Sequence, residues 1–346
     1  MKNILILDAN QRSALAATRS LGERNLKVVT AETFNLTLAG ASKYSRNKFI
    51  YPSPEIDESG FIKVVKEQIS VFKIDLLLPM TEIKTSVILE NRSHFEGVHL
   101  PLCDYEKFDC ISNKFELFLT AKKLDILIPA TIFIDDVKNI NIEIQNLEYP
   151  VVIKPNRSRI HGGNGWVSTK VRYANSRNEL LDIIKKNDYL QKNPFLIQEY
   201  IIGTGQGVFA LYENGEHKVF FSHKRIREKP PSGGVSVLCE SIALTEYLKS
   251  ISTKLLDYYK WHGVAMVEYK IGIDGKPYLM EINGRFWGSL QLAIDSGVDF
   301  PYYLYLMSAG KLHCLPDDYI EGMRSRWLLG DLDHLLLVLK NNKLPC

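Results

Sequence analysis

Short apolar runs and amphipathic segments alternate along the first third of the chain. The apolar runs predict buried strands, and the segments between them repeat apolar residues at helical spacing. Strands are expected at residues 3–8, 26–31, 75–79 and 98–102, with helices at 13–24 and 61–72. Strands and helices that alternate in this way usually build a parallel sheet. An open parallel α/β layer is therefore expected at the start of the chain.

The pattern then changes to short strands, longer helices and glycine-rich turns. A helix at 114–124 and a strand at 151–155 precede the glycine-rich loop 158–165, behind which lie a strand, a helix and another strand. This segment is typical of a small α+β lid.

A β meander comes next. Its strands are expected at residues 195–202, 208–212 and 217–227, with Gly203–Gly207 as a link and Asn214-Gly215 as a tight hairpin turn. Helices at 244–259 then precede two strands around Asp274-Gly275, and the remainder is mainly helical. The fold class is therefore mixed, α/β followed by α+β.

The composition is that of a folded protein of more than one domain. The chain has 346 residues, more than one core usually holds, and we divide it into residues 1–112, 113–199 and 200–346. Apolar residues make up 45%, and the net charge of +3 arises from 43 basic and 40 acidic residues. Because the charges are balanced and form no long run of one sign, nucleic acid is not an expected partner.

The cysteine pattern indicates a reducing compartment, and the apolar segments give no sign of membrane insertion. The cysteines show no Cys-x-x-Cys spacing, which argues against a disulfide framework and a structural zinc site. The N-terminus has no signal-peptide core, and no apolar segment reaches transmembrane length. We expect a soluble, cytoplasmic protein. The cysteines are Cys103, Cys110, Cys239, Cys314 and Cys346.

The loop after the first strand, residues 8–13, contains no glycine. A dinucleotide fingerprint needs glycines there for close approach to a pyrophosphate, so a nicotinamide or flavin enzyme is disfavoured. Ligands often bind at the ends of the strands in such sheets, which makes Asn10, Thr81 and Glu82 candidate substrate contacts. Capping and turn roles are the alternative for each.

Two late strands that flank a turn carry the most informative polar residues. A two-residue turn at Asp274-Gly275 would place Glu268 directly opposite Glu281. Asn283, two residues further on, would then share their face. Opposed carboxylates are unfavourable unless a cation neutralises them, and carboxylate, amide and phosphate oxygens suit Mg²⁺. The alternative is a solvent-facing sheet edge, and a one-residue change in the turn would separate the glutamates.

Lys154 ends an apolar strand, where an ammonium group needs an anionic partner. Lys114 opens a helix, where a cation opposes the helix dipole and can be recruited by an external anion. The backbone N–H groups of His161, Gly162 and Gly163 could cover phosphates, so the three elements predict a triphosphate clamp. Surface lysines and a plain turn are the alternative.

Three further positions complete the candidate site. Arg285 follows the second glutamate by four residues and could neutralise a phosphoryl group in flight, or form a salt bridge to one of the glutamates. Arg225 is a second candidate for the phosphoryl group or an acyl phosphate. Polar residues interrupt the apolar strand that ends near residue 202, where adenine could bind, unless ordinary strand hydrogen bonds satisfy them. The adenine candidates are Gln198, Glu199 and the backbone of Tyr200 and Ile201, and Gln206 is the candidate ribose contact.

The order of these motifs resembles the ATP-grasp superfamily over essentially the whole chain. The motifs are a lysine opening a helix, Val-Val-Ile-Lys-Pro, a glycine-rich lid loop, Gln-Glu-Tyr-Ile, Val-Glu-Tyr and Glu-Ile-Asn-Gly-Arg. The likeness is greatest to carbamoyl-phosphate-synthase-like single-module proteins, with a Rossmann-like pre-grasp domain, a lid subdomain and a C-terminal catalytic subdomain. One departure is Gln206, which stands where the family usually has an acidic ribose contact. The resemblance implies that Lys114 and Lys154 bind ATP phosphates, that Glu268, Glu281 and Asn283 hold magnesium, and that Arg285 contacts the transferred phosphoryl group.

The resemblance also implies an activity. It is γ-phosphoryl transfer from ATP to a carboxylate, which gives an acyl phosphate, followed by attack of an amine to give an amide. The implied cofactors are ATP and Mg²⁺, with Mn²⁺ as another ion that could serve, and the substrates are a small carboxylate and an amine. A carbamoyl-phosphate-synthase-type enzyme acting on bicarbonate and a non-catalytic nucleotide-binding regulator are the alternatives. A homodimer is a reasonable expectation for such an enzyme.

Overall fold

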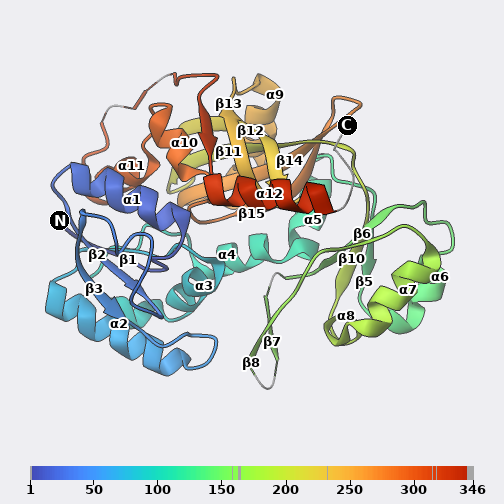
Figure 1. Ribbon diagram of the computed structural model, residues 1–346, viewed down its shortest axis with the longest axis horizontal. Coiled ribbons are helices and arrows are strands. Elements are labelled where there is room, and N and C mark those ends of the chain that lie inside the picture. Colours follow the sequence, from blue (N-terminus) through green and yellow to red (C-terminus); the bar gives the residue numbers. More distant parts are fainter. Residues whose placement is uncertain are drawn as a thin grey trace. The chain divides into compact units, whose positions relative to one another are not determined.

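The computed structural model describes residues 2–340 except Ser158, Gly163, Asn164, Ser232, Cys314 and Asp317 (Figure 1). The described residues form two compact units. The first unit takes its residues from Met1–Lys107, Thr204–Val267 and Asn283–Cys346, and the second from Phe108–Gly203 and Glu268–Ile282. Each unit is therefore built from segments that are distant in the sequence. The domain divisions that we placed after residues 112 and 199 remain predictions.

The first unit begins with a parallel sheet of strand order β3-β2-β1-β4. Strands β1 and β4 and most of β2 are buried, which is why their apolar runs predicted them correctly. Strand β3 is polar and largely exposed at the edge of the sheet, so periodicity gave no signal for it. The elements are β1 (Asn3–Ile6), α1 (Arg12–Glu23), β2 (Lys27–Glu32), β3 (Ser45–Ile50), α2 (Glu58–Phe72), β4 (Leu76–Leu78), α3 (Glu82–Glu90) and the 3₁₀ turn η1 (Arg92–Phe95).

The strand expected at residues 98–102 was wrong. A single parallel bridge joins Leu76 to His99, and no strand is assigned to this segment. The backbone N–H of Leu77 donates to the His99 carbonyl, and that of His99 to the Asp75 carbonyl. These two backbone hydrogen bonds therefore hold the segment against β4 at the edge of the sheet.

A six-stranded sheet has the order β15-β14-β11-β12-β13-β16. The hairpin turn at Asn214-Gly215 is confirmed, since both residues have positive φ and Glu213 pairs with Glu216. The link expected at Gly203–Gly207 was wrong, because these residues are the first part of β11. The strands are β11 (Gly203–Glu213), β12 (Glu216–Lys229), β13 (Val235–Ser241), β14 (Gly263–Gly272), β15 (Pro277–Asn283) and β16 (Arg324–Arg326).

Close packing explains at least one of the glycines in β11. A Cβ atom on Gly207 would lie 2.6 Å from the ring of Phe209 and 3.1 Å from the ring of His223. Glycine in a strand interior often marks such a close approach. Composition alone suggested a loop here. In the structure the segment is a strand, and the two rings leave no room for a side chain at Gly207.

A large hydrophobic core of the first unit links its parallel sheet to later segments. It joins residues of the parallel sheet, such as Ile4 and Leu76, to Phe209 on β11 and to Trp287 and Phe300 near the C-terminal helices. Phe209 and Trp287 pack with ring centroids 4.3 Å apart. The helices of this part are α9 (Glu246–Tyr258), α10 (Leu290–Asp295), α11 (Phe300–Ser308) and α12 (Leu328–Lys340).

The second unit is an antiparallel sheet of order β5-β10-β6-β9 with helices. Ile153 and Ile197 from the sheet and Leu180 from α7 lie in its separate core. This is the α+β character that the sequence predicted. The elements are α5 (Lys114–Lys123), β5 (Thr131–Ile134), η2 (Val137–Asn139), α6 (Ile140–Glu143), β6 (Val151–Pro155), β7 (Arg159–Gly162), β8 (Gly165–Ser168), β9 (Arg172–Ala174), α7 (Arg177–Lys186), α8 (Asp188–Lys192) and β10 (Phe195–Glu199), and α4 (Tyr105–Ser112) leads into the unit.

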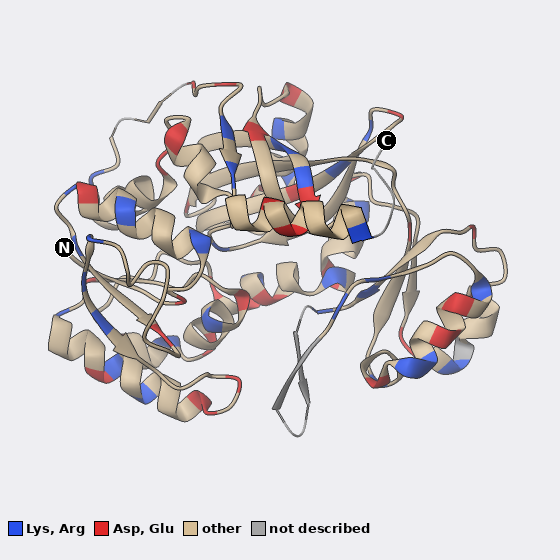
Figure 2. Ribbon diagram, viewed as in Figure 1, with Lys and Arg blue, Asp and Glu red and all other residues tan. Residues whose placement is uncertain are grey.

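The described residues carry both signs of charge, as the nearly balanced composition predicts. Basic and acidic residues are interspersed along both units (Figure 2). No helix among these residues has the length and apolar character needed to cross a membrane.

Candidate functional site

Lys154 is the residue around which the candidate site can be built. It lies on β6, opposite Leu196 of β10, and its Nζ atom is 3.7 Å from the sulfur of Met280. The pKa of Lys154 is lowered to about 8, mainly by burial and next by the nearby Lys114, while Glu281 and Glu268 act in the opposite direction. Two cations and two carboxylates of the second unit therefore lie close enough to influence one another.

Hydrogen bonds between the start of α5 and the end of β6 place Lys114 near Lys154. The Asn113 side chain caps α5 by accepting from the N–H groups of Phe115 and Glu116. Asn156, just after β6, accepts the Lys114 N–H at its carbonyl, 3.0 Å away, and the Phe115 N–H at its side-chain oxygen. The start of α5 is thus tied to the end of the strand that carries Lys154. A bound anion would relieve the repulsion between the two ammonium groups.

The turn between β14 and β15 differs from the prediction. The Gly275 N–H donates to the Gly272 carbonyl and the Gly272 N–H to the Lys276 carbonyl, each at 2.9 Å. The loop therefore has three residues, with Gly275 at φ +77°, in place of the two-residue turn. Counting back from this pair in regular register would put Glu268 opposite Met280. The predicted two-residue turn was therefore wrong, and the direct opposition of Glu268 and Glu281 stays a prediction.

The two glutamates nevertheless both reach the surroundings of Lys154, since each acts on its pKa. Along β15 buried and half-buried residues alternate up to Met280, but Met280 and Glu281 are both half-buried. Glu281 and Asn283 are thus both half-buried, separated by the buried Ile282.

Asn283 and Arg285 follow at the end of β15. An Nη atom of Arg285 donates to the Asn283 side-chain oxygen at 3.0 Å, and the other Nη donates to the carbonyl of Phe286 at 2.8 Å. The Nε atom of Arg285 is buried without a hydrogen-bond partner. The guanidinium group is thus held beside the amide that the sequence predicted as a metal ligand.

The oxygen donors present fit a magnesium ion only if a ligand completes the set. Among the described residues no three His, Cys, Asp or Glu side chains are grouped as a metal site. Glu268 and Glu281 of the second unit would supply two carboxylates, which leaves positions for phosphate oxygens or water. Mg²⁺ is usually bound in this way, by one or two carboxylates together with substrate phosphates.

The residues predicted for adenine lie at the end of β10. Gln198 is buried and donates to the Thr131 hydroxyl at 2.8 Å, while its Oε1 atom is buried without a partner. Glu199 is exposed and bonds the backbone of Ala130. Tyr200 packs edge-on against Tyr173, and Ile201 is buried. Among the side chains of this group, the Oε1 atom of Gln198 is a buried acceptor that no described residue satisfies.

The remaining predicted site residues are Gln206, Arg225 and those of the glycine-rich loop. Gln206 is buried and donates to the Ser222 hydroxyl at 3.3 Å, and Arg225 bonds Glu228 at 2.8 Å and the Gly234 carbonyl at 3.0 Å. His161 and Gly162 belong to β7 and pair with Trp166 and Gly165, whereas Gly163 lies outside the described residues. Both Gln206 and Arg225 are thus engaged in protein contacts.

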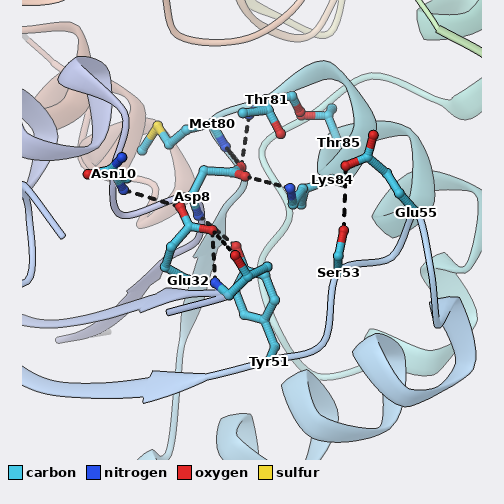
Figure 3. Close-up of polar contacts among 11 residues, drawn as sticks. Asp8, Asn10, Glu32, Tyr51, Ser53, Glu55, Met80, Thr81, Lys84 and Thr85 are labelled. Carbon is cyan, nitrogen blue, oxygen red and sulfur yellow. Dashed lines mark hydrogen bonds and ion pairs between the residues drawn. The ribbon is translucent and has the colours of Figure 1, made fainter. Parts of the chain in front are cut away.

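The carboxyl ends of the parallel strands hold a polar network that sequence reasoning missed (Figure 3). Asp8 lies at its centre with φ +56°; its carboxylate accepts from the N–H groups of Met80 and Thr81 at 3.0 Å and lies 3.3 Å from Lys84 Nζ. Burial raises the pKa of Asp8 despite the nearby Lys84. The Asn10 N–H donates to Glu32 at 3.3 Å. The backbone amides of Asn10 and Thr81 thus stabilise the sheet edge, and Glu82 is the first residue of α3.

Comparison with known proteins adds to this geometry. A family model described as "ATP-grasp in the biosynthetic pathway with Ter operon" matches residues 191–329. The L-amino acid ligase from Bacillus licheniformis superposes with a TM-score of 0.69 at 18% identity, over 93% of this chain and 75% of that one. The chain has the ATP-grasp fold. The fold class predicted from the sequence is therefore confirmed, and so is the resemblance to the ATP-grasp superfamily at the level of the fold.

Two further solved ATP-grasp structures are similar. N5-carboxyaminoimidazole synthetase from Staphylococcus aureus, complexed with ADP, gives a TM-score of 0.68 at 16% identity, over 92% of this chain and 80% of that one. The biotin carboxylase domain of the Hydrogenobacter thermophilus 2-oxoglutarate carboxylase, with MgADP and bicarbonate, gives 0.71 at 15% identity, over 93% and 73%. No curated protein matches the chain.

Proposed function

We propose that the protein is an ATP-dependent carboxylate-amine ligase that forms an amide through an acyl phosphate, with release of ADP and phosphate. The observation that carries this proposal is the placement of Lys154 and Lys114 near Glu268 and Glu281. The two lysines can bind an anionic triphosphate, and the two glutamates can bind the metal ion that accompanies it.

The chain's own residues have distinct roles in this proposal. Lys154 and Lys114 bind the terminal phosphates and hold them near the acceptor carboxylate, which makes the transfer a matter of positioning. Arg285, held by Asn283, places its guanidinium group where negative charge develops on the phosphoryl group. Mg²⁺, held by Glu268, Glu281 and Asn283, would supply charge neutralisation between the phosphates when bound. Mn²⁺ could take the same place.

Adenine recognition belongs to the end of β10 in the same proposal. The unpartnered Oε1 atom of Gln198 is an acceptor that the exocyclic amine of adenine could satisfy. The backbone of Tyr200 and Ile201 would bind the edge of the base, and the β7–β8 hairpin with His161 and Gly162 would cover the phosphates. A ribose contact by Gln206 requires its amide to leave Ser222, and a phosphoryl contact by Arg225 requires it to leave Glu228.

The similar solved structures support this class of chemistry for small molecules. They are an L-amino acid ligase, an N5-carboxyaminoimidazole synthetase with ADP and a biotin carboxylase domain with MgADP and bicarbonate. The third keeps bicarbonate as a candidate acid for this chain, in line with the carbamoyl-phosphate-synthase-type alternative. A regulator without turnover would not need two carboxylates close to the lysines that are proposed to bind phosphate.

The test is ADP formation from ATP and Mg²⁺ with pools of small carboxylic acids and amines, including bicarbonate with ammonia. We expect turnover that needs both an acid and an amine, and an amide product by mass spectrometry. Turnover with bicarbonate and ammonia alone would favour the second enzyme, and nucleotide binding without turnover in any pool would favour the regulator. Absence of nucleotide binding would contradict all three.

A further inference from the structure

Helix α12 exposes a row of leucines that the proposed chemistry does not use. Between 50% and 68% of each of six leucine side chains is open to solvent. Scattered exposed leucines are normal, but these share one helix of 13 residues, most of which is uncharged in Figure 2. They are Leu328, Leu329, Leu332, Leu335, Leu336 and Leu339.

The opposite face of the helix is fixed to the sheet, so the leucines cannot turn inward. Gly330, His334 and Val338 are buried at a spacing of four residues. Both oxygens of Asp331 lie 2.6 Å from the guanidinium group of Arg227 on β12, and Asp333 pairs with Lys229 on the same strand. At 100° per residue, the leucines are centred almost diametrically opposite the buried residues.

The spacing of the leucines is that of a helix-pairing seam. Leu328, Leu332, Leu335 and Leu339 are separated by four, three and four residues, the spacing of the d and a positions of a heptad. This spacing reads the same in both directions along the helix. A second copy of α12 placed antiparallel across a twofold axis therefore presents a matching row, with Leu332 near Leu335 of the other copy and Leu328 near its Leu339.

Area and charge also favour a second copy as the occupant. The leucines expose on the order of 600 Å², at the upper end of what a monomer leaves open. Pairing would bury about 1,200 Å² in total, at the lower end for a specific interface. A helix that lies on a membrane surface carries many lysines and arginines on its polar face, whereas α12 has one lysine and two aspartates, both in ion pairs.

We propose that α12 is a self-association surface through which two copies of this chain form an antiparallel twofold dimer. Its leucines interdigitate with those of the second copy, and its acidic residues stay paired with β12. This proposal does not depend on the ligase activity, since it uses none of the residues proposed for the nucleotide site.

The first test is sedimentation velocity of the full chain between about 1 and 100 µM, a range that brackets the affinity of a small interface. We expect a dimer for the unchanged chain and at least about a 100-fold higher dissociation constant for Leu332→Glu/Leu335→Glu, because each change counts twice across a twofold axis. Ile56→Glu, the same exchange at a residue 90% exposed elsewhere in the first unit, should leave the dimer intact. Leu328→Ser/Leu339→Ser is a milder second variant, and circular dichroism checks that each variant is folded.

Several results would overturn the proposal. They are a monomer at the highest concentration, a dimer that both double variants leave unchanged, or a dimer that Ile56→Glu weakens equally. Binding of the unchanged chain to phosphatidylcholine-phosphatidylglycerol vesicles that Leu332→Glu/Leu335→Glu abolishes would assign the leucines to a membrane surface instead. A mixture of Leu328→Cys and Leu339→Cys chains should cross-link 328 to 339. Efficient cross-linking of Leu328→Cys to itself would contradict the antiparallel arrangement.

Discussion

Lys84 is buried and Lys154 is half-buried, and the two lysines differ in what compensates their charge. Lys84 has a dedicated partner, because Asp8 lies 3.3 Å from its Nζ atom and both side chains are almost fully buried. Lys154 has no carboxylate within ion-pair distance among the described residues. Its Nζ atom contacts the Met280 sulfur, and the charge with the largest effect on its pKa is another lysine, Lys114. The first arrangement is complete in the protein alone, and the second is not.

This difference separates a structural ion pair from a ligand-binding group. A buried cation with its own carboxylate stabilises the fold only while both members are present. A cation that the protein leaves uncompensated has its pKa lowered and gains most from an external anion. Changes at Asp8 should therefore affect stability, whereas changes around Lys154 should affect nucleotide binding and turnover.

The largest expected effect is on turnover. Glu281→Gln should lower ATP-dependent ADP formation by about 100-fold or more, because it removes carboxylate charge from the proposed metal site. The melting temperature should change by less than about 3 °C. Glu143→Gln, the same exchange at an exposed residue of the second unit, is the matched control. ADP formation at the original rate in Glu281→Gln would remove this residue from the site.

The next effect tests the other lysine. Asp8→Asn keeps a residue that tolerates positive φ, but it leaves Lys84 as an uncompensated buried charge. We expect the free energy of unfolding in urea to fall by roughly 3–5 kcal/mol. The double change Asp8→Asn/Lys84→Met should recover much of this loss. A loss below about 1 kcal/mol for the single change would mean that the ion pair has no structural role.

A smaller effect is expected on nucleotide affinity. Lys154→Ala should weaken ATP binding by about 10- to 100-fold, the usual value of a charged hydrogen bond to phosphate. Stability should be unchanged or slightly higher, because a desolvated cation is removed. Calorimetric titration measures the affinity, and Lys192→Ala, an exposed lysine of the same unit, is the control. Equal affinity in Lys154→Ala would exclude it from the phosphate site.

The smallest effect is on pH dependence. The pKa of Lys154 is about 8 without nucleotide, and bound phosphate should raise it. As pH rises above 8 the free protein loses this proton first, so ATP affinity should fall by up to tenfold per pH unit. Binding at pH 8.5 should therefore take up protons, measurable by calorimetry in buffers of different ionisation enthalpy. No proton uptake, or equal uptake in Lys154→Ala, would contradict the assignment.

The sequence predicted those parts of the fold that hydrophobic periodicity determines. Strands β1, β2 and β4 are buried runs, and the Asn214-Gly215 turn has its own backbone signal. Strand β3 escaped detection because an exposed edge strand needs no apolar face. The glycines that begin β11 were interpreted as a link because composition does not reveal which rings pack against a strand.

The candidate site shows the same division. Residue type and order indicated Lys154, Lys114 and the two glutamates, and the structure places these four near one another. Their register was beyond the sequence, because a three-residue turn and the shifted alternation at Met280 are decided by backbone hydrogen bonds and packing. The Asp8 network was also missed, since an aspartate after a strand usually serves as a cap or a ligand.

The interleaved construction of the two units has a consequence for how the chain is made. The second unit includes residues 268–282, so it is incomplete until that hairpin has left the ribosome. A fragment that stops at residue 203 would contain both lysines but neither glutamate. Neither unit can be obtained by a single cut, and genetic dissection of this protein has to join distant segments of the gene.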